Sequence, residues 1–425
     1  MERGNLVRSV RLAPTEFPAV PAGDALYEHE RIWFPSYPHE WPAELLHAAG
    51  QLTQELGRGA LTEGFGLKDA TPYNVLFQGG TPVFVDVLSF ERRDGRDATW
   101  MAYSQFVQTF LLPLLAYREF GLLPADLFMR RREGLEPEEM YRMAGLRQQL
   151  SPEFLSLVTL PHWMSGVMTR RSTAGRYHPE PLDSEEKARF VLDRLLANCS
   201  RKLARLEPQA TKSAWTDYLD HKSLYSSAQL EQKDRFVREA LDRARPRTVL
   251  DVGANEGHFS FMAADQKASV VAIDSDASVT GNIWRQARAR NLDVLPLVVD
   301  LARPTPALGW RNQECDSFLD RARGSFDLVM MLAVIHHMLV TERVPLEEIV
   351  ALAAELTRGY LLIEFVAPSD PMFMRIVRGR ESLHLNLTRA AFESAAALHF
   401  DLVKAEPLDG LDRCLYLYRL RSSKA

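Results

Sequence analysis

The chain is poor in cysteine and in long apolar runs, and it carries no excess of positive charge. Its 425 residues include three cysteines, Cys199, Cys315 and Cys414, which lie far apart and lack the spacing of metal ligands. They are typical of reduced thiols in a cytoplasmic protein, and they predict no metal site. The longest apolar run, FVQTFLLPLLAY, spans about 12 residues. That is too short for a bilayer and is typical of a buried helix.

The charge balance and the N-terminal stretch narrow the class of partner. A net charge of -5 argues against a large surface for nucleic acid or an anionic membrane. The first residues, MERGNLVRSVRLAP, lack the apolar core of a signal peptide. We therefore expect a cytoplasmic protein with neither nucleic acid nor membrane as its partner. The length allows two or three domains with sizeable cores.

The hydrophobic pattern changes between the two halves of the chain. The first half is helix-rich, with a hairpin predicted near 74–90, where NVLFQGG and TPVFVDVLSF flank a Gly-Gly turn. The second half alternates short apolar runs with helical segments, which predicts a parallel sheet covered on both faces. Its last runs, HFDLVKAEPL and RCLYLYRL, predict a terminal hairpin through DGLD. We predict a helix-rich α+β domain at 1–210 and an α/β domain at 211–425.

A glycine turn, DVGANEG, follows the first predicted strand of the second half. Gly253 and Gly257 would let the backbone turn sharply and approach a ligand at the end of that strand. Asp251 and Glu256 would repel a pyrophosphate, but they suit a ligand with positive charge. S-adenosylmethionine, which has a sulfonium and an ammonium group, is such a ligand.

Two further carboxylates follow the next strands in order. Asp274 closes the second strand, 23 residues after Asp251, where a carboxylate can accept hydrogen bonds from both ribose hydroxyls. Asp300 closes the third strand and could contact the adenine amino group. The alternative is a Rossmann domain for NAD or a nucleotide sugar.

These motifs resemble those of the class I S-adenosylmethionine-dependent methyltransferases over about residues 230 to 425. Within that class the chain resembles a narrower bacterial family of nodulation-type methyltransferases. LKDATPYNVLF and PVFVDVLSFE carry this resemblance in the first half, and DVGANEGHFS, ALGWRNQE, LAVIHHM and IEFVAPSDPM carry it in the second. It implies a Rossmann-like, mostly parallel seven-stranded sheet with a C-terminal antiparallel hairpin, and S-adenosylmethionine as the cofactor. The expected donor-binding residues are Asp251, Gly253, Asn255, Gly257, Asp274, Asp300 and Ala333, together with Tyr225 and Lys233 in a segment that often covers the donor in this fold.

The end of the fourth strand, LAVIHHM, is the position for a catalytic base. A neutral imidazole can take a proton near pH 7. His336 and His337 are adjacent and would point in different directions, so one could be the base while the other is structural, or both could be structural. As the base we favour His337. Glu364, at the end of the fifth strand, could orient an acceptor hydroxyl or a histidine, or act only as a salt-bridge partner. Trp310, in GWRNQE, is a further candidate for the pocket wall.

The acceptor is constrained mainly by motifs that the sequence lacks. It has no Asn/Asp-Pro-Pro-aromatic turn, which is typical of adenine amine methylation, and no Pro-Cys for attack on a pyrimidine. We therefore expect methylation of an oxygen on a small-molecule or glycan-like acceptor. The alternatives are a regulatory protein that binds the donor without turnover, or a kinase-like ATP-binding module in the first half.

The kinase-like alternative comes from the spacing of Asp69, Asn74 and Asp86. It matches a catalytic Asp, a metal-holding Asn and a second metal-binding Asp in protein kinases. A kinase also needs a glycine-rich loop and a remote lysine, and the preceding residues have no such loop, while Lys68 is too close to Asp69. Two interpretations stay open, a hydrogen-bonded loop that stabilises the hairpin and a kinase-like scaffold reused to shape the acceptor pocket.

Overall fold

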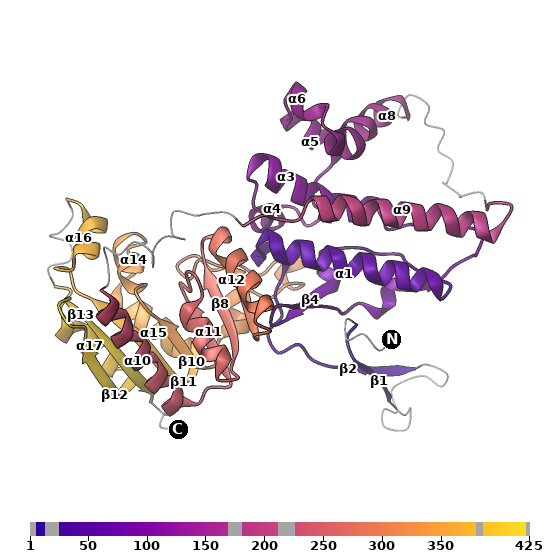
Figure 1. Cartoon of the computed structure of the whole chain (residues 1–425). Helices are drawn as coiled ribbons and strands as arrows, with labels where there is room; N and C mark the ends of the chain where they lie inside the picture. The colour runs from indigo at the N-terminus through magenta and orange to yellow at the C-terminus, as the bar shows by residue number, and fades with distance from the viewer. Residues whose placement is uncertain (1–5, 13–24, 169–180, 211–225, 380–385, 422–425) are drawn as a thin grey trace. The chain divides into compact units, whose positions relative to one another are not determined.

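The computed structural model describes residues 6–12, 25–168, 181–210, 226–379 and 386–421. Contacts divide the chain into two compact units, Met1–Gln209 and Ala210–Ala425, and each is described by itself (Figure 1). Among the described residues, no helix combines the length and apolar character needed to cross a membrane.

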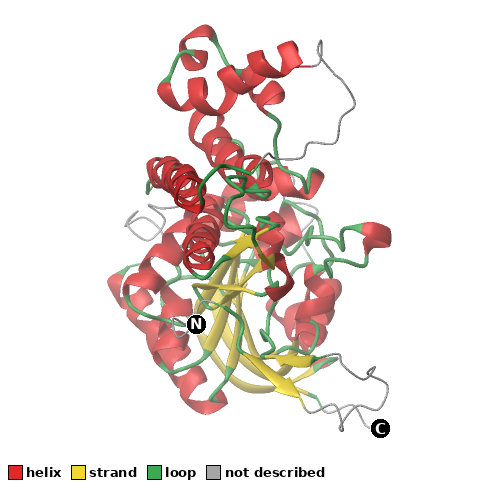
Figure 2. Ribbon diagram, turned by 90° about the vertical axis from the view of Figure 1, so that its right-hand side faces the viewer, coloured by secondary structure: helices red, strands yellow, loops and turns green. Residues whose placement is uncertain are grey.

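The second unit is built on one seven-stranded sheet with the order β12-β13-β11-β10-β7-β8-β9. Strands β7 to β11 pair in parallel, whereas β13 pairs antiparallel with β11 and with β12. Figure 2 shows helices on both sides of this sheet. The strands are β7 Thr248–Val252, β8 Ser269–Asp274, β9 Val294–Val298, β10 Phe326–Met331, β11 Thr357–Val366, β12 Phe400–Pro407 and β13 Arg413–Leu420. The predicted sheet and its antiparallel terminal hairpin are confirmed.

Eight α-helices of this unit fall within the described residues. They are α10 Ser227–Ala244, α11 His258–Asp265, α12 Ala277–Ala289, α13 Phe318–Ala322, α14 Ile335–Val340, α15 Leu346–Leu356, α16 Pro371–Val377 and α17 Arg389–Ala397. The central strands are apolar almost throughout, because helices cover both faces of the sheet. Leu250, Val271 and Val329 are each 0% exposed, so the core runs through the middle of the sheet.

The order of the strands fixes where a ligand can bind. From β7 the chain builds β8 and β9 on one side, and then returns to place β10 and β11 on the other. The register aligns Val252, at the end of β7, with Met331 of β10 and Ile273 of β8. In such open sheets a crevice forms outside the carboxyl ends of the strands, at the point where the order reverses.

The first unit is rich in helices and contains small two-stranded sheets. The predicted hairpin is present as β4 Val75–Gln78 and β5 Thr81–Phe84. The other strand pairs are β1 Ser9–Leu12 with β2 Leu26–His29, and β3 Phe65–Leu67 with β6 Phe90–Arg92. The helices are α1 Ala43–Thr62, α2 Tyr103–Phe106, α3 Leu112–Phe120, α4 Pro124–Arg130, α5 Pro137–Met143, α6 Leu146–Gln149, α7 Pro152–Phe154, α8 Leu160–Met168 and α9 Glu185–Arg205.

The apolar run FVQTFLLPLLAY is buried, as predicted, but it is not one regular helix. It passes from the end of α2 through a π-helical turn, Val107–Leu111, into α3. Pro113 has no backbone N–H to donate to the preceding turn, and the helix widens immediately before it. Phe110, Leu111 and Leu114 are 0% exposed.

The loop with kinase-like spacing is held by hydrogen bonds. Asn74 Nδ2 donates to Ser89 Oγ at 3.0 Å, and Ser89 Oγ donates to Asp86 Oδ2 at 2.6 Å. The other carboxylate oxygen of Asp86 accepts from the backbone N–H of Leu88 at 3.1 Å. Asn74 and Asp86 therefore join the two ends of the hairpin through Ser89, which is the arrangement of a stabilising loop.

Candidate active site

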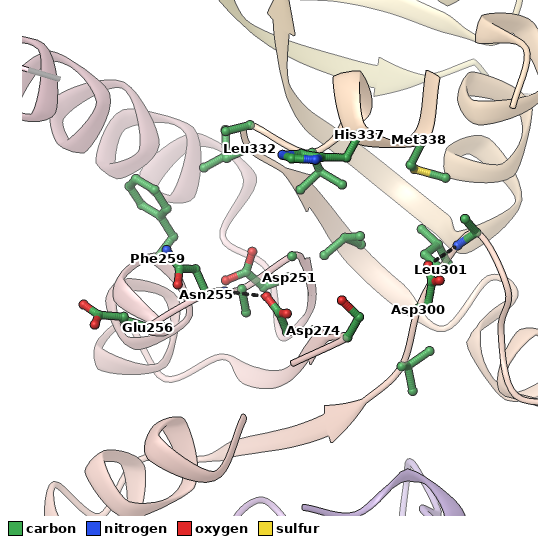
Figure 3. A pocket seen from close by; sticks show the side chains of 18 of the residues that line it. Asp251, Asn255, Glu256, Phe259, Asp274, Asp300, Leu301, Leu332, His337 and Met338 are labelled. Carbon is green, nitrogen blue, oxygen red and sulfur yellow. Dashed lines mark hydrogen bonds between the residues drawn. The ribbon is translucent and has the colours of Figure 1, made fainter. Parts of the chain in front are cut away.

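A cavity of about 560 Å³ opens at the carboxyl ends of β7, β8, β9 and β10, where the strand order reverses. Its walls come from the glycine turn after β7, the segments after β8 and β9, the residues from Leu332 to Val334, and one side of α10 and of α14. In Figure 3, His337 faces the space bounded by Asp251, Asp274 and Asp300. The structure therefore brings the expected base and the three expected carboxylates to one cavity.

The glycine turn has a backbone that suits glycine at two points. Gly253 has a φ of 65°, and a Cβ there would lie 2.5 Å from Cγ2 of Val334. Gly257 has a φ of 80° and is the N-cap residue of α11. Asn255, between them, has a φ of 47°, a conformation that asparagine tolerates better than most residues. The turn can thus pack directly against the chain that follows β10.

Asp251 is a buried carboxylate at the floor of the cavity. It is 3% exposed and accepts a hydrogen bond of 2.6 Å from the Ser260 hydroxyl. Burial, together with the nearby Asp274, raises the pKa of Asp251 to about 7, although the hydrogen bond from Ser260 opposes this. A cation placed against this carboxylate would favour its charged form. The site is therefore prepared for a positively charged group.

Asp274 ends β8 and is fixed by backbone donors. Its Oδ2 accepts from the N–H of Asn255 at 3.0 Å, and its Oδ1 accepts from the N–H of Asp276 at 3.0 Å. Burial raises the pKa of Asp274, and these hydrogen bonds act in the opposite direction. Each carboxylate oxygen retains a further lone pair for a ligand hydroxyl.

Asp300 lies in the cavity wall, two residues beyond the end of β9, so the expectation that it closes the strand is slightly wrong. The chain bends there, and Asp300 Oδ1 accepts from the N–H of Ala302 at 3.0 Å. Arg303 reaches from the same loop to Asp300 at 3.2 Å and to Glu342 at 3.3 Å. This pair of contacts joins the loop after β9 to the segment that follows α14.

The segment after β10 separates the two adjacent histidines. Ala333 lines the cavity with a φ of 55°. His337 also lines it, and burial lowers the pKa of its imidazole. His336 is 0% exposed and is absent from the cavity wall, although its ring centroid lies 4.3 Å from that of His337. Burial and the neighbouring His337, Arg413 and Lys233 lower the pKa of His336 to about 3, so it stays neutral near pH 7.

Lys233 and Glu364 form a buried ion pair. Lys233, on α10, lines the cavity, and its Nζ lies 2.8 Å from Glu364 Oε2. Glu364 is 0% exposed and does not line the cavity; its Oε1 lies 3.4 Å from Arg413 Nη1. The side chain of Glu364 is thus directed toward buried cations rather than toward the space for an acceptor.

Tyr225 and Trp310 were also expected at the site. Tyr225 lies outside the described residues. Trp310 is 77% exposed and does not line the cavity. The loop after Gly309 turns through left-handed backbone at Arg311 and Asn312, with φ values of 56° and 57°. The indole of Trp310 lies at the surface and outside the cavity wall.

Some residues of the cavity wall were not predicted from the sequence. Thr341 lines the cavity four residues after His337, so helical spacing from that histidine could have found it, and Glu342 follows it directly. Asp234 and His258 also line it and lie 2.8 Å apart, but no sequence motif marks them. Within the part of the chain that the structure describes, no three Asp, Glu, His or Cys side chains are grouped to hold a metal ion.

A sequence relative decides the family. Nodulation protein NoeA of Rhizobium meliloti (strain 1021) is 30% identical over 390 residues, which cover 90% of this chain and 79% of the relative. The chain belongs to the NoeA family. A family model described as a methyltransferase domain matches residues 224–406, which include the whole cavity wall. This member of the NoeA family is therefore a class I S-adenosylmethionine-dependent methyltransferase, with S-adenosylmethionine as its cofactor.

Solved structures with lower similarity include two other methyltransferases. N-methyltransferase NodS from Bradyrhizobium japonicum WM9 is 12% identical, with a TM-score of 0.35, and the match covers 46% of this NoeA-family chain and 99% of NodS. The bifunctional kinase-methyltransferase WbdD is 20% identical, with a TM-score of 0.32, and the match covers 48% of this chain and 41% of WbdD. These likenesses are too distant to bear on acceptor or mechanism.

Proposed function

We propose that this enzyme transfers the methyl group of S-adenosylmethionine to an oxygen of a small-molecule or glycan-like acceptor, with His337 as the base. One observation carries the proposal: a neutral imidazole, the buried carboxylate of Asp251 and the partly buried carboxylate of Asp274 line the same cavity. The carboxylates suit a cationic nucleoside, and the imidazole lies where an acceptor can meet the methyl group.

The donor contacts follow from the position of each wall residue. Asp251 would pair with the donor's ammonium group, and Asp274 would accept hydrogen bonds from the ribose hydroxyls. Asp300 would accept from the adenine amino group, between the apolar side chains of Val299 and Leu301. The turn residues Gly253, Asn255 and Gly257 would bring backbone close to the donor, with Ala333 opposite them. Lys233 would contact the donor's carboxylate, and Tyr225 is proposed from the family resemblance alone.

The transfer itself is an in-line displacement. The acceptor oxygen forms a bond to the methyl carbon while the bond from that carbon to sulfur breaks, which leaves neutral S-adenosylhomocysteine. The acceptor's proton passes to the imidazole of His337, which then becomes positively charged. Alignment supplies much of the rate enhancement, and proton removal adds to it when the acceptor is an alcohol. His336 and Glu364 would support the site without touching the acceptor.

Donor binding and donor consumption test the proposal separately. We expect His337→Gln to bind S-adenosylmethionine within about twofold of the unsubstituted enzyme in calorimetry. Formation of S-adenosylhomocysteine with a panel of hydroxylated metabolites and oligosaccharides should fall by about 10²–10⁴-fold. If the panel supports turnover and His337→Gln leaves it unchanged, His337 is not the base. A second panel of acceptors is prepared from cell extract. If the enzyme binds the donor but turns over no acceptor in either panel, the alternative of a regulatory protein that binds the donor without turnover is favoured.

The first unit is proposed to help select the acceptor, with the boundary between the two domains near residues 210 and 211. The hydrogen bonds of Asp86 with Ser89 and Leu88 argue against its use as a metal ligand for ATP. Titration with magnesium ATP should therefore give no heat. Binding of magnesium ATP that Asp86→Asn abolishes would instead support the kinase-like alternative.

A further inference from the structure

Four buried charged side chains are connected by successive ion pairs, and the first of them lines the cavity. Lys233 of α10 contacts Glu364 of β11 at 2.8 Å, and Glu364 contacts Arg413 of β13 at 3.4 Å. Arg413 then makes two contacts with Asp370, of 2.7 Å from Nε and 2.9 Å from Nη2. The exposed fractions of these residues are 3%, 0%, 4% and 1%, respectively. Two positive and two negative charges are thus removed from water together.

Such an arrangement is not explained by stability alone. Burying ion pairs costs desolvation energy, and replacing them with apolar residues is often neutral or stabilising. Of these four described side chains, Lys233 is the one that lines the cavity. The others extend away from it, and Asp370 accepts from the N–H of Met372 at 2.9 Å at the start of α16. The contacts therefore anchor one cavity-facing ammonium group to three elements of the fold.

We propose that Glu364, supported by Arg413 and Asp370, is a positioning residue that holds the Lys233 ammonium group at the cavity wall to receive the carboxylate of the methyl donor. This rests on the proposed function, because it requires the donor in this cavity. It also replaces the earlier expectation that Glu364 orients the acceptor.

The charges around the cavity support this choice of ligand group. Asp234, Asp251, Glu256 and Asp274 give the wall near α10 and the glycine turn a negative character, which suits the donor's ammonium and sulfonium groups. The donor also carries one carboxylate, and a buried cation in the same wall is its natural partner. Lys233 lies there, with its Nζ 5.6 Å from the centroid of the Phe259 ring.

His336 lies close to Lys233, Glu364 and Arg413 and is compatible with them as a neutral ring. Its ring is fully buried, and neither ring nitrogen has a hydrogen-bond partner among the described residues. A protonated His336 would add a third positive charge beside Lys233 and Arg413. As a neutral ring it fills space against His337 and leaves the balance of the four charges intact.

The test compares two glutamates that both connect α10 to the sheet. Glu364→Gln keeps the shape of the side chain but removes the charge facing Lys233. Glu406→Gln is the matched control, because Glu406 bonds Gln232 and Arg235 on the same helix, each at 3.0 Å, and does not contact Lys233. We expect Glu364→Gln to raise the Kd for S-adenosylmethionine at least tenfold, and Glu406→Gln to change it less than about twofold.

Decarboxylated S-adenosylmethionine provides a second readout, since it keeps the sulfonium and the ammonium but lacks the carboxylate. Glu364→Gln should leave its Kd within about twofold. Both affinities are measured at one pH and compared with those of the unsubstituted enzyme, since Asp234 and Asp251 also line the cavity.

The outcomes separate this inference from the proposed function. If the unsubstituted enzyme does not bind S-adenosylmethionine, the proposed function fails. If it binds, and Glu364→Gln binds both donors as tightly as the unsubstituted enzyme, the positioning role is overturned. Should Glu364→Gln not fold, Lys233→Met/Glu364→Gln removes both charges together and is expected to fold. That double variant should no longer distinguish the two donors, and a retained preference for the carboxylate would contradict the proposal.

Discussion

Asp251 combines a role in donor binding with a cost to the unliganded fold. Its pKa of about 7 in the folded protein lies above its ordinary value of 3.8. The folded state therefore holds this proton more firmly than the unfolded state between these pH values. The proton on Asp251 therefore contributes fully to stability below the ordinary pKa. That contribution decreases as pH rises and is lost as pH passes through about 7.

Asp251→Asn should remove that loss, because the amide does not ionise and can still accept from Ser260. At pH 8 the free energy of unfolding should rise by up to about 4 kcal/mol relative to the unsubstituted protein, and at pH 4 the difference should vanish. Denaturant titrations at the two pH values measure this. The same variant should lose at least tenfold in donor affinity. Equal stability at both pH values would show that burial does not perturb Asp251.

The protonation state of His337 should determine how the rate of methyl transfer depends on pH. Burial lowers its pKa below the ordinary 6.5, and the base must be neutral to accept a proton. With the donor saturating, so that its ammonium holds Asp251 in the charged form, we therefore expect kcat to stay on a plateau through pH 6.5 and to fall only as the pH drops through the lowered pKa of His337. In His337→Gln the remaining activity should lack this acidic limb. A limb that persists in the variant would assign the titration to another group.

Some residues of the cavity were predicted correctly from the sequence and others were not, and the reasons are physical. Asp251 and Asp274 were found because a carboxylate at the end of a parallel strand must lie at the crevice. Glu364 was assigned by the same reasoning, but β11 continues to Val366 and directs Glu364 toward α10. Trp310 is exposed in a loop with left-handed backbone at Arg311 and Asn312, and residue type alone does not reveal such a loop.

At the level of elements, the strand-turn-helix from β7 to α11 was predictable because the glycines, the apolar strand and the following helix are contiguous. The close contact between Gly253 and Val334 was not, because it joins segments about 80 residues apart in the chain. The π-helical turns Val107–Leu111 and Leu155–Thr159 were also missed, since an apolar run has the same appearance in either kind of helix.

Gly253→Ala tests that close contact. Its Cβ would lie 2.5 Å from Val334, and its φ of 65° disfavours alanine. We expect the turn to shift and the donor Kd to rise at least tenfold. Gly324→Ala is the matched control, because its φ is 58° and nothing lies within 4 Å of the added Cβ. The control should lose about 1–2 kcal/mol of stability from backbone strain and keep its donor affinity. Similar donor affinities in both variants would mean that the turn does not hold the donor.

At the scale of the whole molecule, the hydrophobic pattern predicted a helix-rich domain at 1–210 and an α/β domain at 211–425, and contacts divide the chain after Gln209. What each unit contributes could be inferred only for the second, because its chemistry lies in short motifs at strand ends. The helices of the first unit bury Phe106, Phe110 and Phe154 completely, and core aromatics of this kind specify packing rather than a reaction.

Donor binding should therefore stabilise one unit selectively. At a donor concentration 100-fold above its Kd, binding adds about 2.7 kcal/mol to the unit that holds the site. We expect hydrogen exchange to slow in β7, β8 and α14, while amides in the cores of α1 and α9 exchange at unchanged rates. Asp274→Ala should abolish the protection and provide the control. Equal protection of both units would contradict a donor site confined to the second, and would mean that the first unit takes part in binding the donor.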